Sequence, residues 1–499
     1  MYDIDAPDLK LGVIGAGAMG SGIAHLAAVS GIEVRILDTR EGAAATSCDG
    51  IAKRLQKRAD DGKMDPDEAE ASIARLKPAN AMSDFAPCNI VIEAIVEDLD
   101  IKAAVFQELE GIVSDDAILA SNTSSLPIGA IAARVKGRAR IAGMHFFNPA
   151  PVMKLVELIR GPDTAEPVMD ALLALANRMT RTPVVVKDSP GFLVNFGGRA
   201  YTTEALAIRH EQVADPAEID AVMKDGFGFR MGPFELMDLT GIDVNFPVTR
   251  FVHESSFGDP RLRSTPEHRY LLETGQLGRK TKRGFYDYGE GAETPTPDTA
   301  AEASPATAVF QHGDDPILAG LISESGAELL TQDDGISPIL ASPLGIDATA
   351  YATQFGLDHR RLVCVDTVPD VSTRVTLMTA PGADDAARGA VIALFAAMRR
   401  VTAIQDSPGF IAQRIAAMVA NLGCEMAQTG LATPTDIDLA MRLGLNYPKG
   451  PLELADSIGP ARVHTILTGL QHLTGDDRYR PSQWLRRRGA LGLSALQPA

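Results

Sequence analysis

The sequence is poor in cysteine, and the few cysteines that it has form no recognisable pattern. Four occur in 499 residues, and no two of them are spaced as C-x-x-C. The spacing therefore indicates neither a zinc site nor a disulfide framework. We expect no metal, and a reduced compartment, the cytoplasm, fits best.

The chain also lacks a surplus of positive charge. It has 47 Lys and Arg against 65 Asp and Glu, which gives a formal net charge of -18 at pH 7. Contacts to phosphate backbones and anionic membranes need clustered cations, so we expect neither a nucleic acid nor a membrane as partner. The first residues, Met-Tyr-Asp-Ile-Asp-Ala-Pro, are acidic and precede no long apolar run, so we expect no signal peptide.

A glycine-rich turn joins an apolar run to an Ala-rich stretch near the start of the chain. Residues 11–20 read Leu-Gly-Val-Ile-Gly-Ala-Gly-Ala-Met-Gly, which predicts a strand that turns into a helix over 21–30. In this G-x-G-x-x-G pattern, Gly15 permits a tight turn and Gly17 leaves room for a pyrophosphate, while Gly20 lets the helix pack closely on the strand. A flexible glycine loop is the alternative interpretation.

An acidic residue follows at the spacing of a dinucleotide site. A second strand, 33–37, ends in Asp38, whose carboxylate can accept hydrogen bonds from ribose hydroxyls. The helix N-terminus would hold the phosphates, and Ala18 and Met19 of the glycine turn are further candidate cofactor contacts. We expect NAD rather than NADP, because a 2′-phosphate would face a like charge, although Arg40 lies close by.

Polar residues follow two further predicted strands at the same edge of a doubly wound sheet. The buried strand within 89–97 ends in Glu97 and is followed by Lys102, and the strand 117–120 runs into the polar tip 121–125. Ligands collect at this edge in such sheets, so both charged residues are candidate cofactor contacts. Helix capping and surface roles are the alternatives.

A histidine and a carboxylate complete the set. The strand 140–144 runs into His145, and the next strand, 154–159, carries Glu157. A histidine base needs a carboxylate on its other ring nitrogen to fix its tautomer and stabilise the imidazolium. Sequence alone does not show that the two side chains meet.

Six motifs therefore follow one another along residues 9–290. They are the glycine pattern, Glu93-Ala-Ile-Val-Glu97, Ser121-Asn-Thr-Ser-Ser125, His145-Phe-Phe-Asn-Pro149, Lys154-Leu-Val-Glu157 and Asp188-Ser-Pro-Gly-Phe-Leu-Val-Asn195. In this order and spacing they resemble the 3-hydroxyacyl-CoA dehydrogenases of fatty acid metabolism. The double-length chain is most similar to the bacterial 3-hydroxybutyryl-CoA and 3-hydroxyadipyl-CoA dehydrogenases of phenylacetate breakdown.

The resemblance implies NAD-dependent, reversible oxidation of a (3S)-hydroxyacyl-CoA, short-chain or dicarboxyl, with His145 as general base and Glu157 as its orienting partner. Cofactor contacts that it implies beyond the glycine loop are Asp38, Glu97, Lys102 and Lys280, and substrate contacts are Ser124, Asn148 and Asn195. The lysine that the family places against the CoA phosphates has no secure match; the candidates are Arg54, Lys57 and Lys63. Candidate cations for the tail of a dicarboxyl substrate are Arg199, Arg209, Arg230 and Arg250.

Arg54 and Lys57 belong to a cluster of cations on the polar face of the predicted helical segment 41–76. Its other members are Lys53 and Arg58. A solvated helix face is the ordinary interpretation of such a cluster, and binding of an anionic substrate is the alternative.

Beyond residue 290 the chain repeats itself. The motif at 406–413 echoes 188–195, and 450–454 echoes 232–236, both with an offset of 218 (406 minus 188 and 450 minus 232). A shared offset indicates duplication. We predict a Rossmann-type α/β dinucleotide-binding domain at 1–187, an all-α domain at 188–290, a linker at 291–308, a degenerate α/β segment at 309–405 and a second all-α copy at 406–499.

We expect the second copy to be catalytically silent. It offers Asp366 or a neighbour where the first copy has His145, no carboxylate in 375–380, and Gln413 in place of Asn195. Its predicted role is packing, as an intrachain pseudo-dimer of the helical domains, and further association into homo-oligomers is left open. Two other functions also stay open: a dehydrogenase of a free β-hydroxyacid, for which a lysine base is expected, and an NAD-binding structural or regulatory protein with a vestigial site.

Overall fold

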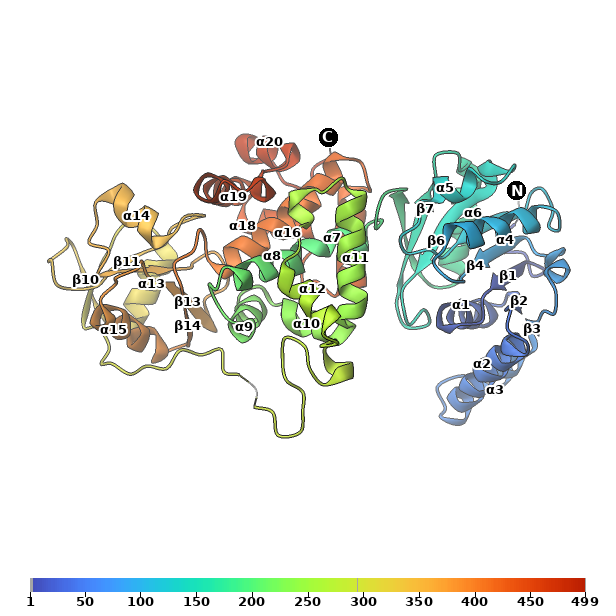
Figure 1. Cartoon of the computed structure of the whole chain (residues 1–499), viewed down its shortest axis with the longest axis horizontal. Helices are drawn as coiled ribbons and strands as arrows, with labels where there is room; N and C mark the ends of the chain where they lie inside the picture. Colours follow the sequence, from blue (N-terminus) through green and yellow to red (C-terminus); the bar gives the residue numbers. More distant parts are fainter. Residues whose placement is uncertain (1–2, 294, 499) are drawn as a thin grey trace. The chain divides into compact units, whose positions relative to one another are not determined.

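The computed structural model describes residues 3–293 and 295–498, which divide into two compact units (Figure 1). Unit 1 comprises the chain up to Phe196 together with Gly430–Leu445. Unit 2 comprises Gly197–Thr429 and the chain from Asn446 onward. Each unit therefore combines residues from both halves of the sequence.

Unit 1 is built on an eight-stranded sheet of order β3-β2-β1-β4-β5-β6-β7-β8. Its strands are β1 (Lys10–Ile14), β2 (Glu33–Leu37), β3 (Leu76–Pro78), β4 (Ile90–Glu93), β5 (Ile118–Ser121), β6 (Ile141–Phe146), β7 (Leu155–Arg160) and β8 (Thr182–Lys187). All neighbours are parallel except β6 and β7. The chain order reverses at β1, which makes the carboxyl end of β1 the topological switch point where doubly wound sheets bind ligands.

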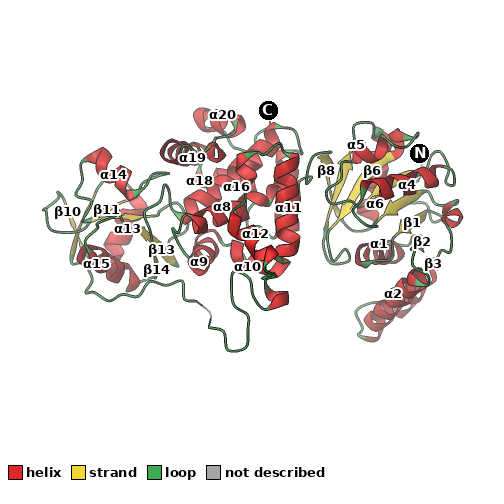
Figure 2. Cartoon of the chain, viewed as in Figure 1, coloured by secondary structure: helices red, strands yellow, loops and turns green. Residues whose placement is uncertain are grey.

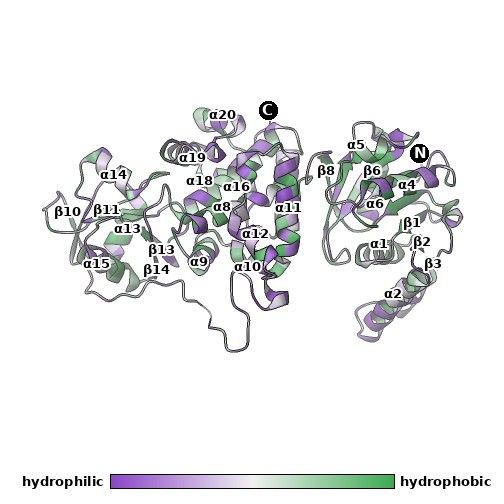
Figure 3. Cartoon of the chain, viewed as in Figure 1, coloured by the Kyte–Doolittle hydropathy of each residue, from purple (hydrophilic) through white to green (hydrophobic). Residues whose placement is uncertain are grey.

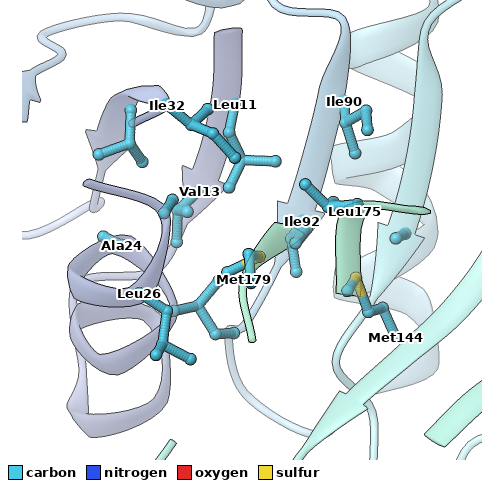
Figure 4. Close-up of a cluster of buried hydrophobic side chains, with 14 of the residues drawn as sticks. Leu11, Val13, Ala24, Leu26, Ile32, Ile90, Ile92, Met144, Leu175 and Met179 are labelled. Atoms are coloured by element: carbon cyan, nitrogen blue, oxygen red, sulfur yellow. The ribbon is translucent and has the colours of Figure 1, made fainter. Parts of the chain in front are cut away.

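Helices cover this sheet (Figure 2). They are α1 (Ala18–Val29), α2 (Ala43–Asp60), α3 (Pro66–Ala74), α4 (Leu99–Glu110), α5 (Ile128–Ala132), α6 (Glu166–Arg178) and α17 (Pro434–Leu445), and the short α7 (Val194–Gly197) ends the unit. The core forms because the inner strands are apolar along most of their length and are buried on both faces, as is typical of a parallel sheet between helices. Figure 4 shows Leu11 and Val13 of β1 packed in one buried cluster with Leu26 of α1 and Leu175 of α6.

The local predictions for this region hold in part. The strand 33–37 has the predicted bounds. The helix predicted over 21–30 begins three residues earlier, at Ala18, directly after Gly17. The predicted helical segment 41–76 is two helices, because Asp65 caps a new helix that Pro66 begins. The predicted strand 89–97 ends at Glu93, so Glu97 lies in the loop before α4.

Unit 2 contains a smaller sheet of order β10-β9-β11-β12-β13-β14. Its strands are β9 (Ala308–Gln311), β10 (Glu328–Leu330), β11 (Ile339–Ala341), β12 (Leu362–Val365), β13 (Arg374–Met378) and β14 (Arg400–Ile404), with helices α13 (Pro316–Ser325), α14 (Ala348–Phe355) and α15 (Asp385–Ala396). As in the larger sheet, one pair is antiparallel, β12 with β13, and the last strand is parallel to its neighbour. This agreement supports the predicted degenerate copy.

The remainder of unit 2 is helical (Figure 2). It comprises α8 (Arg199–His210), α9 (Pro216–Phe227), α10 (Pro233–Thr240), α11 (Ile242–Ser255), α12 (Pro266–Glu273), α16 (Ile411–Gln428), α18 (Pro451–Ile458), α19 (Pro460–Thr474) and α20 (Gln483–Leu491). The long α16 of the second copy is buried along nearly its whole length and packs against α8 of the first. Helices such as α10 and α11 carry both hydrophilic and hydrophobic residues (Figure 3). Within the described residues, no helix is long and apolar enough to cross a bilayer.

Candidate active site

The glycine loop has the geometry of a phosphate-binding turn. Gly15 has a φ of +103°, and a Cβ there would lie 2.4 Å from the carbonyl oxygen of Ala94. A Cβ on Gly20 would lie 1.8 Å from the carbonyl oxygen of Gly15, so helix and strand approach too closely for any side chain. By contrast, a Cβ on Gly17 would meet no atom within 4 Å. That open space, in front of the unpaired N–H groups of α1, fits a pyrophosphate.

Asp38 ends β2 beside this loop. Its carboxylate accepts hydrogen bonds from the backbone N–H of Ala16 at 2.8 Å and from Arg40, whose backbone N–H and Nε both lie at 3.0 Å. The hydrogen bonds from the Arg40 guanidinium hold the pKa of Asp38 well below its usual range. The carboxylate is therefore charged at any physiological pH, which suits ribose hydroxyls and repels a 2′-phosphate.

Glu93 and Lys102 form a buried ion pair where β4 ends. Glu93 is fully buried and accepts hydrogen bonds from Lys102 Nζ at 2.6 Å and from Ser121 Oγ at 2.7 Å. Lys102 is 1% exposed, and its Nζ also lies 3.3 Å from Glu97. The predicted cofactor contact Lys102 thus holds two carboxylates in place in this structure.

Glu97 organises the polar tip after β5. One of its oxygens accepts hydrogen bonds from Thr123 Oγ1 at 2.7 Å, from the backbone N–H of Ser124 at 2.9 Å and from Ser125 Oγ at 2.8 Å. Burial acts to raise the pKa of Glu97, but the hydroxyl of Thr123, the charge of Lys102 and the bonds from Ser125 together hold it below its usual value. An ionised Glu97 therefore fixes Ser124, the predicted substrate contact.

His145 and Glu157 meet across the one antiparallel pair of the sheet. The register places them directly opposite each other, and His145 Nδ1 lies 2.7 Å from Glu157 Oε2. Both side chains are buried, with His145 6% exposed and Glu157 0%. The other Glu157 oxygen accepts the backbone N–H groups of Leu193 at 3.1 Å and Val194 at 2.8 Å.

This arrangement selects one tautomer of the histidine. A carboxylate only accepts hydrogen bonds, so Nδ1 carries the hydrogen and Nε2 is left as an acceptor. The rings of Phe147 and Phe192 lie 4.6 and 6.0 Å from the imidazole ring, centroid to centroid. The pair thus presents an oriented imidazole among aromatic rings, which is the arrangement that general base catalysis requires.

Two predicted substrate contacts lie together in unit 1. Asn195 Nδ2 donates a hydrogen bond to the carbonyl oxygen of Ser124 at 3.3 Å. The loop of Ser124 is tied to the histidine strand, because Asn122 Oδ1 accepts the backbone N–H of Phe146 at 2.8 Å. Asn148, two residues further along, is exposed.

The other predicted contacts belong to unit 2. Lys280 pairs there with Asp243. Three of the four predicted tail-binding cations have partners within the unit. Arg199 is buried and donates to Thr249, Arg209 pairs with Asp215, and Arg250 pairs with Glu254. Burial lowers the pKa of Arg199 to about 10. Its guanidinium is buried in the helical domain, where it donates to the Thr249 hydroxyl.

The candidate CoA cations separate into two places. Arg54 reaches the glycine loop, where its Nη2 donates to Ser21 Oγ at 3.2 Å. Lys63 lines a cavity of about 490 Å³ on unit 1, together with His25, three arginines (Arg58, Arg178 and Arg181) and one acidic residue, Glu68. Lys57 is exposed on α2 and does not line this cavity.

Sequence reasoning missed Arg178, the last residue of α6, and Arg181, which follows this helix; both are far from the cation cluster in the chain. Arg178 donates to the backbone carbonyls of Ala6 and Gly31, and Arg181 to that of Met153. Burial and the charges of Arg54 and Arg58 lower the pKa of His25 to about 4, so the histidine in this cavity is neutral. Only the fold brings these residues to the end of α2.

The equivalent positions of the second sheet lack the catalytic pair. Asp366 follows β12 and is paired opposite Thr376, as its backbone N–H donates to the Thr376 carbonyl at 3.0 Å. Gln413 Nε2 donates to the buried Asp366 carboxylate at 3.0 Å. The loop after β9 carries Asp314 and Asp315 instead of a second glycine, and carboxylates there repel a phosphate.

Asp366 gives a testable effect on stability. Its burial raises the pKa to about 6, so the carboxyl contributes stability below about pH 4 that is lost as pH rises through about 6. We expect Asp366→Asn to raise the free energy of unfolding by about 2 to 3 kcal/mol at pH 8 and by about half as much at pH 5. Thermal melts of both proteins at both pH values measure this. An equal difference at the two pH values contradicts it.

Family comparisons agree with this geometry. A model of the 3-hydroxyacyl-CoA dehydrogenase NAD-binding domain matches residues 10–189, and one of the 3-hydroxyacyl-CoA dehydrogenase C-terminal domain matches residues 191–288 and 409–495. The 3-hydroxyadipyl-CoA dehydrogenase of Escherichia coli K12 is 37% identical over 96% of this chain and 97% of its own. The chain belongs to the 3-hydroxyacyl-CoA dehydrogenase family. Membership confirms the predicted family, NAD as its cofactor, and the repeated C-terminal domain.

Solved structures of dehydrogenases support the same fold. A crystal structure of 3-hydroxybutyryl-CoA dehydrogenase from E. coli K12 has a TM-score of 0.86, 36% identity, and coverage of 97% of this chain and 98% of its own. A crystal structure of (S)-3-hydroxybutyryl-CoA dehydrogenase from Ralstonia eutropha has a TM-score of 0.54 and 38% identity, covering 56% of this chain and 99% of its own. This dehydrogenase chain therefore resembles both a double-length and a single-length relative. No group of three or more potential ligand side chains in its described part is placed to hold a metal ion.

Proposed function

We propose that this protein catalyses the NAD-dependent, reversible oxidation of (3S)-3-hydroxyacyl-CoA to 3-ketoacyl-CoA. The observation that carries the proposal is the buried His145–Glu157 pair, with Nδ1 and Oε2 2.7 Å apart, on the sheet that also carries the glycine loop. Bound NAD supplies the hydride acceptor. The chain supplies the base and the alignment of the substrate.

His145 takes the hydroxyl proton at its Nε2 atom during oxidation and returns it during reduction. Glu157 stabilises the imidazolium that forms, and its own position is fixed by the backbone N–H groups of Leu193 and Val194. The proton therefore moves without a change in the carboxylate. A base positioned in this way typically contributes about 10²- to 10⁴-fold.

Substrate alignment falls to neutral polar groups. Ser124 and Asn195 hydrogen-bond the oxygens of the substrate, and Asn148 lies on the exposed turn beyond the histidine. The proposal is supported by the contact between Asn195 Nδ2 and the Ser124 carbonyl. Holding the reacting carbon within about 3 to 3.5 Å of the hydride acceptor is the contribution expected of such groups.

The cofactor is held at the glycine loop and at Asp38, with Ala18 and Met19 in the first turn of α1. Glu97 and Lys102 approach it from the next strand end, and Lys280 is proposed as a further contact. We expect Asp38→Asn to raise the KM for NADH about 10-fold or more, because a charged hydrogen-bond acceptor is worth about 1.5 to 3 kcal/mol.

The measurement for Asp38 is the KM for NADH with acetoacetyl-CoA saturating. Asp49→Asn is the matched control, since Asp49 is an exposed acid on the neighbouring α2, and its KM is expected to stay within about twofold. An unchanged KM for NADH in the Asp38 variant would contradict the proposal that Asp38 binds the ribose hydroxyls.

The CoA phosphates bind at the cations near α2. Arg58 and Lys63 line the cavity of about 490 Å³ with Arg178 and Arg181, while Arg54 and Lys57 of the same helix are the other proposed contacts. Four cations around one cavity of an otherwise acidic protein favour an anionic group such as a nucleotide phosphate.

Short-chain and dicarboxyl acyl groups are the proposed substrates, because relatives named for 3-hydroxybutyryl-CoA and 3-hydroxyadipyl-CoA match this chain. The test follows NADH absorbance at 340 nm with acetoacetyl-CoA, 3-ketoadipyl-CoA and free acetoacetate. We expect turnover of at least one thioester and none of the free acid. Turnover of the free acid alone would identify a β-hydroxyacid dehydrogenase, and no turnover at all would indicate a vestigial site.

We also propose that the chain is an intrachain pseudo-dimer of its two helical domains, divided as the sequence predicts, with homo-oligomer formation open. Reciprocal ion pairs support this. Arg261 of the first copy lies 3.0 Å from Glu425 on α16, and Arg478 of the second lies 3.5 Å from Glu204 on α8. Each arginine comes two residues after an aspartate that caps a short 3₁₀ turn.

A third pair joins the two copies at their buried centre. Arg414 is 1% exposed and donates to Glu204 at 2.8 Å and to Glu211 at 2.6 Å. Removing one partner of a buried ion pair strongly destabilises a protein, so each helical domain depends on the other. We propose the cytoplasm as the location, which the four free, buried thiols support.

A further inference from the structure

One helix of the second copy belongs to the unit that contains the catalytic pair. Gly430–Leu445, which includes α17, forms part of unit 1. The backbone N–H of Lys187, the last residue of β8, donates to the carbonyl of Leu431 at 2.9 Å, and α17 packs against β7 and β8. The silent half thus contributes a structural element to the catalytic half.

The same arrangement occurs in unit 2 with the copies reversed. There the backbone N–H of Gln405 donates to the carbonyl of Val213 at 3.1 Å, and α9 of the first copy packs against β13. These two residues lie 218 positions before or after their counterparts (405 minus 187 and 431 minus 213), which is the offset of the duplication. The two copies have exchanged one helix each.

At Gly444, α17 packs closely against Leu155 of β7, the strand that carries Glu157. A Cβ at this position would lie 3.0 Å from Val194 Cγ2 and 3.1 Å from Leu155 Cδ2. The glycine lies within a helix and has no left-handed φ, so its backbone conformation does not require glycine. Glycine inside a helix costs about 1 kcal/mol relative to alanine. The close packing is the reason for it here.

Both residues that a side chain at Gly444 would meet are placed next to Glu157. The backbone N–H of Val194 donates to Glu157 Oε1 at 2.8 Å. Leu155 lies two residues before Glu157 on β7, so their side chains point to the same face of the sheet. A shift of either neighbour moves the carboxylate that orients His145.

We infer that Gly444 is a positioning residue for the dehydrogenase reaction and that the silent copy contributes to catalysis through α17. The inference rests on the proposed function, since it acts through the His145–Glu157 pair. It assigns to the second copy a role in the geometry of the reaction, in addition to its packing of the helical domains.

The test compares equivalent substitutions in the two copies. Gly226 is the counterpart of Gly444 (444 minus 226 is 218), and a Cβ there would lie 2.7 Å from Pro369 Cβ, away from any catalytic group. We expect Gly444→Val to lower kcat about 10-fold or more with the KM for NADH within about twofold. Gly226→Val crowds the other exchanged helix, and we expect it to lower the melting temperature but to leave kcat within about twofold.

A relief variant and a milder variant complete the design. Val194→Ala removes the two methyl groups that the new side chain would meet, so we expect Gly444→Val with Val194→Ala to recover most of the lost kcat. Gly444→Ala adds a smaller side chain and gains helix propensity, so we expect it to fold and to lose less kcat. It keeps the test available if Gly444→Val does not fold.

The inference is overturned if both Gly444 variants keep kcat within twofold of the parent, if Gly226→Val loses as much kcat as Gly444→Val, or if Val194→Ala restores nothing. These outcomes differ from failure of the proposed function, in which the parent protein itself shows no activity on 3-ketoacyl-CoA thioesters.

Discussion

Replacing His145 by glutamine is expected to lower kcat for acetoacetyl-CoA reduction by about 10²- to 10⁴-fold while NADH binding is unchanged. The His145 imidazole combines an oriented, proton-accepting nitrogen with a carboxylate behind it, at 2.7 Å. Glutamine fills a similar volume but does not transfer protons at neutral pH. The glycine loop and Asp38, which hold the cofactor, are untouched.

Two measurements separate these effects. Absorbance at 340 nm gives kcat, and fluorescence titration gives the affinity for NADH. His210→Gln is the matched control, because His210 is an exposed histidine at the end of α8, and it is expected to behave as the parent protein. Near-normal turnover of the His145 variant would refute the base assignment, and a loss of NADH binding would show that the substitution disturbs the whole unit.

Replacing Glu157 by glutamine is expected to lower kcat by up to about 10⁴-fold, the loss known for the same exchange of a carboxylate behind a catalytic histidine. The amide oxygen can still accept the N–H groups of Leu193 and Val194. The amide nitrogen then faces His145 Nδ1 and donates to it. The ring hydrogen moves to Nε2, so the atom that must accept the proton from the substrate already carries one.

The kinetic and thermal effects of this variant are expected to differ. The backbone hydrogen bonds to the side chain survive, so the melting temperature should fall by only a few degrees. Glu166→Gln is the control, since Glu166 is an exposed glutamate of the same unit that pairs with Arg160. Unchanged kcat in the Glu157 variant, or a fall fully explained by unfolding, would remove Glu157 from the account.

The sequence predicted those elements whose conformation depends on neighbouring residues in the chain. The bounds of β2 and the turn at Gly15 follow from alternating apolar residues and from a backbone angle that only glycine adopts readily. The pairing of His145 with Glu157 was a hypothesis from spacing, and it follows in the structure from one antiparallel register. A shift of that register by a single residue would have placed the two side chains on opposite faces.

Features that depend on distant contacts escaped prediction. The burial of Lys102 requires Glu93 and Ser121, which converge only when β4 and β5 pair. The arginines around the cavity near α2 carry no sequence pattern of their own, because they come from separate elements. Likewise, Gly444 and Val194 are 250 residues apart in the chain (444 minus 194), and nothing near either residue indicates that they touch.

The central claim is that one oriented imidazole in the first half of the chain handles the proton of a substrate held beside NAD. A crystal structure with NAD and acetoacetyl-CoA bound tests it most directly. The account predicts the pyrophosphate at Gly17 and His145 Nε2 within about 3 Å of the C3 oxygen of the substrate. A nucleotide bound to the β9–β14 sheet, or a histidine out of reach of that oxygen, would contradict it.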